Sequence, residues 1–386
     1  MQRNMLHTTQ RLGGCMIFLD NAGTTKMFDE CVEVHRLYSC EKFFNPSALA
    51  VQSLECKKIV DEAEKYFLSR LGANVGNVLF TSCATESNNL AIKGSLRNGD
   101  WEYVFSAGEH PSVFNVAKRL EADGCKVNIV PLDKSGRVDM QKLAEVLNAK
   151  TRFISIMHVS NETGAINDLI SISKLKEKLC PKAVFHVDGV QGFMKIPFEI
   201  RKTSVDLYSF SAHKIHGPKG IAGLYVKNKD SLKELFQGGG QQYGVRSGTE
   251  NVSGVMQFKK TLELTDEKVN FEKVSKLKNV FNSALRGVKV LDFAGSPYIE
   301  SLIFEGVKGE TMLHALNQEG VIVGLGSACS SKKAGNRVLE EIGIDKQEII
   351  SSVRVSFNAY QSESELTAAA ETISSVYKNI KERMSK

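Results

Sequence analysis

Two short apolar runs decide the fold: VFHVDGVQ at residues 184–191 and LYSFSAHK at residues 207–214. Each run favours a β-strand and ends in polar or ionisable side chains. Similar runs recur along the first two thirds of the chain and alternate with stretches of helical periodicity, which is the pattern of βαβ units. We therefore predict an α/β fold in three layers around a mostly parallel sheet.

Seven strands are predicted in this part of the chain. They lie near residues 78–80, 103–106, 127–130, 153–158, 184–187, 207–210 and 223–226. In an open parallel sheet, ligands bind beyond the carboxyl ends of the strands. The residues that follow each strand are therefore the first candidates for a functional site.

The pattern changes near residue 255. A charged segment follows, with an apolar face from Val274 to Leu285, and the chain ends in a helix with an apolar stripe. Ser362 and Glu365 form a capping box for this last helix. Further strands are expected at residues 288–291, 302–304, 321–323 and 353–355. The chain is thus predicted to comprise an N-terminal extension or arm (1–16), a large domain (17–258) and a smaller α+β C-terminal domain (259–386).

Composition excludes several classes of protein. In the 386 residues, 42% are hydrophobic, 24% are charged and 7 are Pro, which fits an ordinary globular chain and excludes extensive disorder. The net charge of +6 is spread without a basic block, so we expect no nucleic-acid partner. No apolar stretch approaches the roughly 20 residues of a membrane-spanning helix, so we also expect no membrane segment.

The cysteines and the N-terminus bear on location. The 8 Cys include no C-x-x-C pair and no His at metal-ligand spacing, which predicts reduced thiols, no metal site and a cytoplasmic protein. Residues 1–15 hold Arg3 and Arg11 but no acid. A disordered extension or an arm is the preferred interpretation of this segment; a presequence for an organelle matrix is the alternative.

Small hydroxyl residues follow the first predicted strand and open a helix at residues 81–88. The free backbone N–H groups of such a helix start favour a phosphate. The alternative is a simple N-cap by Ser82 or Thr85.

Ionisable groups follow three later strands. Asp188 is placed to pair with a ring nitrogen and His110 to stack on a planar cofactor; the alternatives are a helix cap and an ordinary half-buried histidine. Lys214 stands at the mouth of the sheet, where an amine among apolar walls loses its proton more readily and forms a Schiff base with a carbonyl. Because the phosphate turn, Asp188 and Lys214 share one rim, we favour a pyridoxal phosphate site over a solvated loop lysine.

Eight strings in chain order carry a resemblance that covers nearly the whole sequence. They are FLDNAGTT (18–25), NPS (45–47), ATESNN (84–89), NE (161–162), HVD (186–188), SFSAHK (209–214), RSGT (246–249) and GSAC (326–329). Together they resemble the cysteine desulfurases of the pyridoxal phosphate aminotransferase fold (fold type I, class V), in the branch with the Gly-Ser-Ala-Cys loop. That branch supplies sulfur for iron–sulfur clusters and for thio-modified RNA.

The resemblance implies a role for each matching residue. Lys214 would bind the cofactor covalently and move the substrate α-proton, and Cys329 would attack the sulfur of L-cysteine, leaving L-alanine and an enzyme persulfide. Asn161 and Arg354 would bind the substrate carboxylate. The remaining cofactor contacts would be Asp188 at the ring nitrogen, His110 over the ring as a further catalytic residue, Gln191 near the phenolate oxygen, and Ala84, Thr85, Ser211 and His213 at the phosphate, with Thr249 from the neighbouring subunit of a homodimer.

Cys329 separates this interpretation from a plain aminotransferase. It lies in a Gly- and Ser-rich stretch at residues 324–335, which predicts a mobile loop able to deliver sulfur to an acceptor or iron–sulfur scaffold protein. Lys332 and Lys333 favour its thiolate. The alternative, a buried inert thiol, suits such a polar loop poorly.

The chain departs from the family pattern at four places: Ala50 stands where a His is usual, Cys83 where a Gly, Gly23 where an Ala, and residues 335–337 where a Pro-Ser pair. Other functions therefore stay open. They are a selenocysteine lyase or aminotransferase of the same fold, a non-catalytic assembly partner, and a thiol hydrolase that pairs Cys329 with His314.

Overall fold

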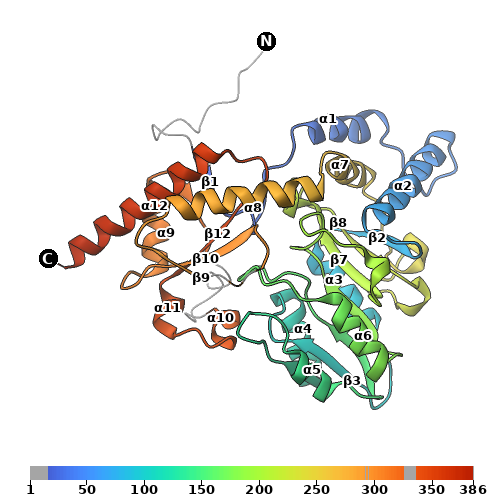
Figure 1. Ribbon diagram of the computed structural model, residues 1–386. Helices are drawn as coiled ribbons and strands as arrows, with labels where there is room; N and C mark the ends of the chain where they lie inside the picture. The colour runs from blue at the N-terminus through green and yellow to red at the C-terminus, as the bar shows by residue number, and fades with distance from the viewer. Residues whose placement is uncertain (1–15, 292, 294, 326–335, 386) are drawn as a thin grey trace, which may run out of the picture.

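The structure is a computed structural model that describes residues 16–385 except 292, 294 and 326–335. Its centre is a seven-stranded sheet in the order β2-β8-β7-β6-β5-β3-β4 (Figure 1). The strands are β2 (Asn77–Thr81), β3 (Glu102–Ser106), β4 (Lys126–Val130), β5 (Thr151–Ser155), β6 (Val184–Asp188), β7 (Leu207–Ser211) and β8 (Ala222–Val226). Only β8 runs antiparallel to its neighbours, so the prediction of a mostly parallel sheet is confirmed.

Helices cover both faces of this sheet because successive strand residues point to opposite sides. On one face, strand residues such as Phe185 and Phe210 pack with Phe67 and Phe258 of the helices. On the other, Phe105 packs with helix residues of a second cluster. The helices are α2 (Val51–Arg70), α5 (Met140–Val146), α6 (Leu169–Leu179) and α7 (Val252–Glu263) on the first face, and α3 (Ala84–Gly94) and α4 (Pro111–Ala122) on the second.

A second sheet lies beside the first in Figure 1 and has the order β12-β10-β9, with all pairs antiparallel. Its strands are β9 (Lys289–Leu291), β10 (Ile299–Ile303) and β12 (Ser352–Ser356), and its helices are α8 (Glu267–Ala284), α9 (Gly309–Gln318), α10 (Arg337–Glu341), α11 (Lys346–Ile350) and α12 (Glu363–Met384). The capping box of Ser362 and Glu365 that we predicted at the start of α12 is present.

The N-terminal described segment joins the two parts. β1 (Ile17–Phe18) pairs in parallel with β11 (Val321–Ile322), and Leu19 packs into the core of the second part. Thr25 then donates its N–H to the His213 carbonyl in the turn after β7. The helix α1 (Glu30–Arg36) and the π-helix η1 (Leu37–Glu41) follow. The predicted divisions after residues 16 and 258 stay proposals.

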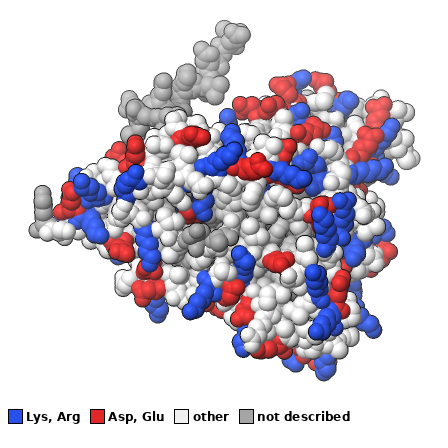
Figure 2. Space-filling model, viewed as in Figure 1, with Lys and Arg blue, Asp and Glu red and all other residues white. Residues whose placement is uncertain are grey.

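Two searches of the described residues bear on the other predictions. In residues 16–325 and 336–385, leaving out 292 and 294, no helix is both long and apolar enough to cross a membrane. The same residues hold no cluster of three or more His, Cys, Asp or Glu that could bind a metal ion. Basic and acidic side chains are interspersed over the face shown in Figure 2.

Candidate active site

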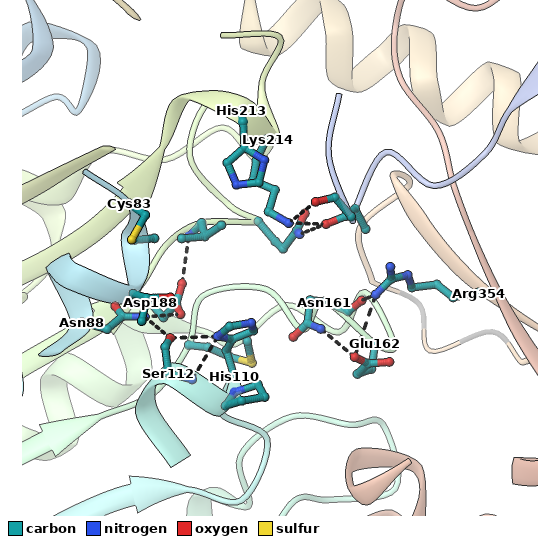
Figure 3. A pocket seen from close by; sticks show the side chains of 18 residues that line it. Cys83, Asn88, His110, Ser112, Asn161, Glu162, Asp188, His213, Lys214 and Arg354 are labelled. Atoms are coloured by element: carbon teal, nitrogen blue, oxygen red, sulfur yellow. Dashed lines mark hydrogen bonds and ion pairs between the residues drawn. The ribbon is translucent and has the colours of Figure 1, made fainter. Parts of the chain in front are cut away.

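A cavity of about 440 Å³ lies beyond the carboxyl ends of the central strands (Figure 3). β2 is antiparallel to β8, which is antiparallel to β7, so β2 ends at the same edge of the sheet as its parallel neighbours. The residues after these strands therefore meet there. The predicted site residues that line the cavity are Ala84, Thr85, His110, Asn161, Asp188, Gln191, His213, Lys214 and Arg354.

Lys214 ends the short 3₁₀ turn η3 (Ala212–Lys214) that follows β7. Its Nζ donates to the carbonyl oxygens of Ala22 (2.6 Å) and Gly23 (2.7 Å). Burial, helped by the positive charge of Arg354, lowers the pKa of Lys214 to about 8. A solvated loop lysine is thus the wrong interpretation, since this amine is half-buried and loses its proton more readily than a lysine in water.

Asp188 is 4% exposed and is held by a network on its cavity side. Its Oδ1 accepts from the Val190 N–H (3.1 Å) and its Oδ2 from Asn88 Nδ2 (2.8 Å). Asn88 Nδ2 also donates to Ser112 Oγ (2.9 Å). The Asn88 amide thus donates one hydrogen to the Asp188 carboxylate and the other to the Ser112 hydroxyl on α4.

His110 caps α4 at the other end of this network. Its Nδ1 accepts the Ser112 backbone N–H (3.2 Å) and lies 2.8 Å from Ser112 Oγ. An N–H can only donate, so Nδ1 carries no proton and the neutral ring is protonated at Nε2. Burial lowers the pKa of His110, which favours this neutral form. His110 thus presents an uncharged ring to the cavity.

The N-terminus of α3 opens onto the same cavity. Cys83 occupies the N-cap position, but its side chain does not cap the helix, and Ser82 donates its N–H and Oγ to Glu86. The predicted N-cap by Ser82 or Thr85 is therefore wrong. The first N–H groups of this 11-residue helix are left for an anion at the cavity wall. Beside them, burial lowers the pKa of His213 to about 4, so its ring is neutral.

Arg354 comes from β12 and closes the opposite wall (Figure 3). Its guanidinium donates to Asp20 Oδ1 (2.8 Å) and to the Asn161 carbonyl (2.9 Å). Asn161 Nδ2 in turn donates to Glu162 Oε1 (2.7 Å), a carboxylate that is 3% exposed. Arg354 Nε is buried without an acceptor among the described residues, which leaves a donor for a ligand carboxylate.

Two of the predicted site residues that the structure describes, Ser211 and Thr249, do not line this cavity. Ser211 is buried at the end of β7, and Thr249 is exposed. Cys329 lies outside the described residues. The role predicted for Thr249 needs a second subunit, so it stays a prediction.

The departures from the family pattern have different consequences. Ala50 is exposed at the N-cap of α2 and does not line the cavity. Cys83 does line it. A Cβ on Gly23 would lie 2.4 Å from Asp20 Oδ2, so glycine at this position lets Asp20 take the place from which it contacts Arg354.

Sequence reasoning gave no role to Asp20, Asn88, Ser112 or Glu162. Asp20, Asn88 and Glu162 lie inside the matching strings at residues 18–25, 84–89 and 161–162. Their place in these strings was the only sequence signal that could have identified them as site residues. Ser112 has no such signal. Its contact with His110 follows from the turn at the start of α4, where Pro111 is the first helical residue.

The cavity fits pyridoxal phosphate. Its volume of about 440 Å³ is in the range of small-molecule sites. It offers an uncapped helix N-terminus for a phosphate, a buried carboxylate in Asp188 for a ring nitrogen, and the amine of Lys214 for an aldehyde. These groups come from separate elements and border one space.

Comparisons with known proteins agree with this geometry. A "NifS/IcsS protein homolog" of Lactobacillus delbrueckii subsp. bulgaricus is 36% identical over 376 residues, which cover 93% of this chain and 97% of that protein. "Cysteine desulfurase IscS" of Buchnera aphidicola subsp. Acyrthosiphon pisum is 34% identical over 92% of this chain and 91% of its own.

Solved structures are also similar. A "NIFS-LIKE PROTEIN" superimposes with a TM-score of 0.88 at 29% identity, covering 95% of this chain and 100% of that one. "SspA in complex with cysteine" has a TM-score of 0.78 at 26% identity, covering 90% and 100%. The family model described as Aminotransferase class-V matches residues 17–368, and on this evidence the chain belongs to the class-V aminotransferase family.

Proposed function

We propose that this chain is a pyridoxal phosphate-dependent cysteine desulfurase, which converts L-cysteine to L-alanine and passes the sulfur to Cys329 as a persulfide. The observation that carries the proposal is the convergence of Lys214, Asp188 and the open N-terminus of α3 around one cavity. Relatives named cysteine desulfurase that align with more than nine tenths of the chain support the choice of substrate. When bound, pyridoxal phosphate supplies an electron sink for charge that develops at the substrate α-carbon.

The residues of the chain divide the remaining work. Asp188, fixed by Asn88, would pair with the ring nitrogen, and the N–H groups of Ala84 and Thr85 would bind the phosphate. Lys214 would hold and move the α-proton at Nζ, since its pKa of about 8 lets the amine exchange protons near neutral pH. His110 would lie against the ring as a neutral imidazole.

The sulfur transfer balances without an external oxidant. The thiolate of Cys329 would attack the substrate sulfur, so that an S–S bond forms while the C–S bond breaks. The electron pair of the C–S bond stays on carbon, which takes up a proton and becomes the methyl group of alanine. A thiol reductant is needed only afterwards, to release the persulfide sulfur as sulfide.

Product analysis tests this function. The full-length protein with pyridoxal phosphate should form alanine from cysteine and release an equal amount of sulfide when dithiothreitol is present. A keto acid in place of alanine would point to an aminotransferase, and no product at all to a non-catalytic partner. A rate with selenocysteine far above the rate with cysteine would identify a selenocysteine lyase.

Replacing Arg354 with alanine should raise the KM for cysteine about 30-fold, because losing a charge-assisted contact to the substrate carboxylate costs about 2 kcal/mol. Steady-state kinetics measure this. Arg70→Ala is the matched control, since Arg70 is half-buried and donates to the Thr265 carbonyl away from the cavity. An unchanged KM in the Arg354 variant would move the carboxylate site elsewhere.

We further propose a homodimer in which Thr249 of the partner subunit completes the phosphate site. Thr249 is exposed, and so is the apolar side chain of Leu49 (92%). Residues 46–47, 239–243 and Glu250 border one hollow, and Tyr243 among them is 49% exposed. Analytical ultracentrifugation should find a dimer; a fully active monomer would contradict the proposal.

The cellular setting is also proposed. The described cysteines are free thiols, which suits a reducing compartment. We propose the cytoplasm, with an organelle matrix as the alternative, and a sulfur-acceptor or iron–sulfur scaffold protein as the partner. We also propose that the chain divides into an arm (1–16), a large cofactor-binding domain (17–258) and a small domain (259–386).

A further inference from the structure

A second lysine lies behind the cavity. Lys195 is 6% exposed, and its Nζ donates to Gln191 Oε1 (2.9 Å) and lies 5.7 Å from the centre of the Tyr298 ring. Among the described residues, no carboxylate forms an ion pair with it. Burial, with the positive charges of Lys214 and Arg354, lowers its pKa to about 7. Burying a charged amine without an opposite charge costs folding free energy. The contact of Lys195 with Gln191 therefore calls for a functional explanation.

That contact is with a side chain of the site. Gln191 is 4% exposed and lines the cavity. Its Nε2 donates to the Ala22 carbonyl (2.9 Å), the same oxygen that accepts from Lys214 Nζ. One continuous hydrogen-bonded run, or chain of hydrogen bonds, therefore links Lys195 to Lys214 through Gln191 and the Ala22 carbonyl.

The chemistry of the two neighbours sets which end of the Gln191 amide faces which way. The protonated amine of Lys195 has only donors, so it must face Oε1, as it does in the structure. A backbone carbonyl has only acceptors, so it must face Nε2. Both neighbours thus favour the same orientation of the amide, and without Lys195 it would lose one of the two contacts that hold its oxygen away from the side where Nε2 lies.

We propose that Lys195 is a positioning residue, which orients the Gln191 amide so that its N–H group, and not its oxygen, meets an anionic oxygen of the bound cofactor. The phenolate oxygen of pyridoxal phosphate is such a group. The inference rests on the proposed function, because it needs this cofactor in this cavity. It adds to that function a lysine that touches neither cofactor nor substrate.

A small cavity of about 20 Å³ adjoins the run and is lined by both Lys195 and Lys214. Both lysines thus border this small cavity, but only Lys214 also lines the larger one. This separates the two lysines by role. Lys214 has access to a ligand, whereas Lys195 acts through Gln191.

A double-mutant cycle tests the proposal. The apoprotein of the wild type, Gln191→Leu, Lys195→Met and the double variant are each titrated with pyridoxal phosphate, and the dissociation constant is measured. Each single change should weaken binding about 10-fold and shift the absorption maximum of the bound cofactor. The double variant should also lose about 10-fold, because Lys195 has nothing to orient once Gln191 is gone.

The matched control is Lys176→Met. Lys176, on α6, is equally buried, at 6% exposed, and its Nζ donates to the Pro181 carbonyl after the end of that helix. This variant should bind the cofactor like the wild type, which separates the loss of any buried lysine from the loss of Lys195. Lys195→Arg keeps a donor for Gln191 and should bind within about threefold of the wild type, so it serves if Lys195→Met does not fold.

Opposite results overturn the inference. Wild-type affinity in folded Lys195→Met, a 100-fold loss in the double variant, or a 10-fold loss in folded Lys195→Arg would each show that Lys195 does not act by orienting Gln191. If the wild type itself binds no pyridoxal phosphate, the proposed function fails and the inference falls with it. If the wild type binds pyridoxal phosphate but the losses of the two single variants add up in the double variant, the proposed function stands and only the role of Lys195 is refuted.

Discussion

Replacing Lys214 with alanine is expected to lower the rate of alanine formation from cysteine by at least about 10⁴-fold. A positioned acid–base group contributes about 10² to 10⁴ by itself, and the covalent role of the amine adds to that. The expectation depends on the surroundings of Nζ, which is half-buried at the cavity and has a pKa of about 8. Initial rates with saturating cysteine and added cofactor measure the loss.

Two comparisons make this result specific. Lys176→Met should keep the wild-type rate, since Lys176 is a buried lysine remote from the cavity. The visible absorption of the wild-type protein with cofactor should also be lost or shifted in Lys214→Ala. A variant that keeps both rate and spectrum would show that another amine performs the chemistry.

Replacing Cys329 with alanine should reduce sulfide release to background while leaving the visible absorption of the bound cofactor unchanged. The reason is that sulfur transfer needs a thiolate to attack the substrate sulfur, whereas cofactor binding does not need this thiol. The residue lies outside the described part of the chain, so the prediction rests on its loop sequence. Sulfide is measured in the presence of dithiothreitol.

The structure supplies the control, because one described cysteine lines the cavity. Cys83 is exposed there, at the N-cap of α3. Cys31 and Cys180 are poor competitors, since burial raises the pKa of both thiols, that of Cys180 to about 11. Cys83→Ala should therefore keep sulfide release near the wild-type rate. Normal release from Cys329→Ala together with loss in Cys83→Ala would assign the transfer to Cys83.

Much of the architecture follows from local patterns. Apolar runs that alternate with helical stretches predicted all seven central strands, and Lys214, Asp188 and His110, which follow three of these strands, line one cavity. Boundaries were less accurate. The strand expected at residues 153–158 ends at Ser155 as β5, although Ile156 and His158 still donate their N–H groups to carbonyls of β6 residues.

The contacts that tune the site could not be predicted in this way. Asp20 meets Arg354 across 334 residues of sequence, and Asn88 reaches Asp188 across 100. The periodicity of apolar residues cannot predict such long-range contacts, because they depend on how separate elements pack. Lys195 looks like an ordinary lysine in sequence, and only its burial against Gln191 distinguishes it.

The central claim is that pyridoxal phosphate binds in this cavity through the amine of Lys214. Reduction of the cofactor-loaded protein with borohydride, followed by protease digestion and mass spectrometry, identifies the lysine that carries the cofactor. The account predicts the phosphopyridoxyl group on the peptide that contains Lys214. Its presence on the peptide of Lys195 or of any other lysine, with Lys214 unmodified, would contradict it.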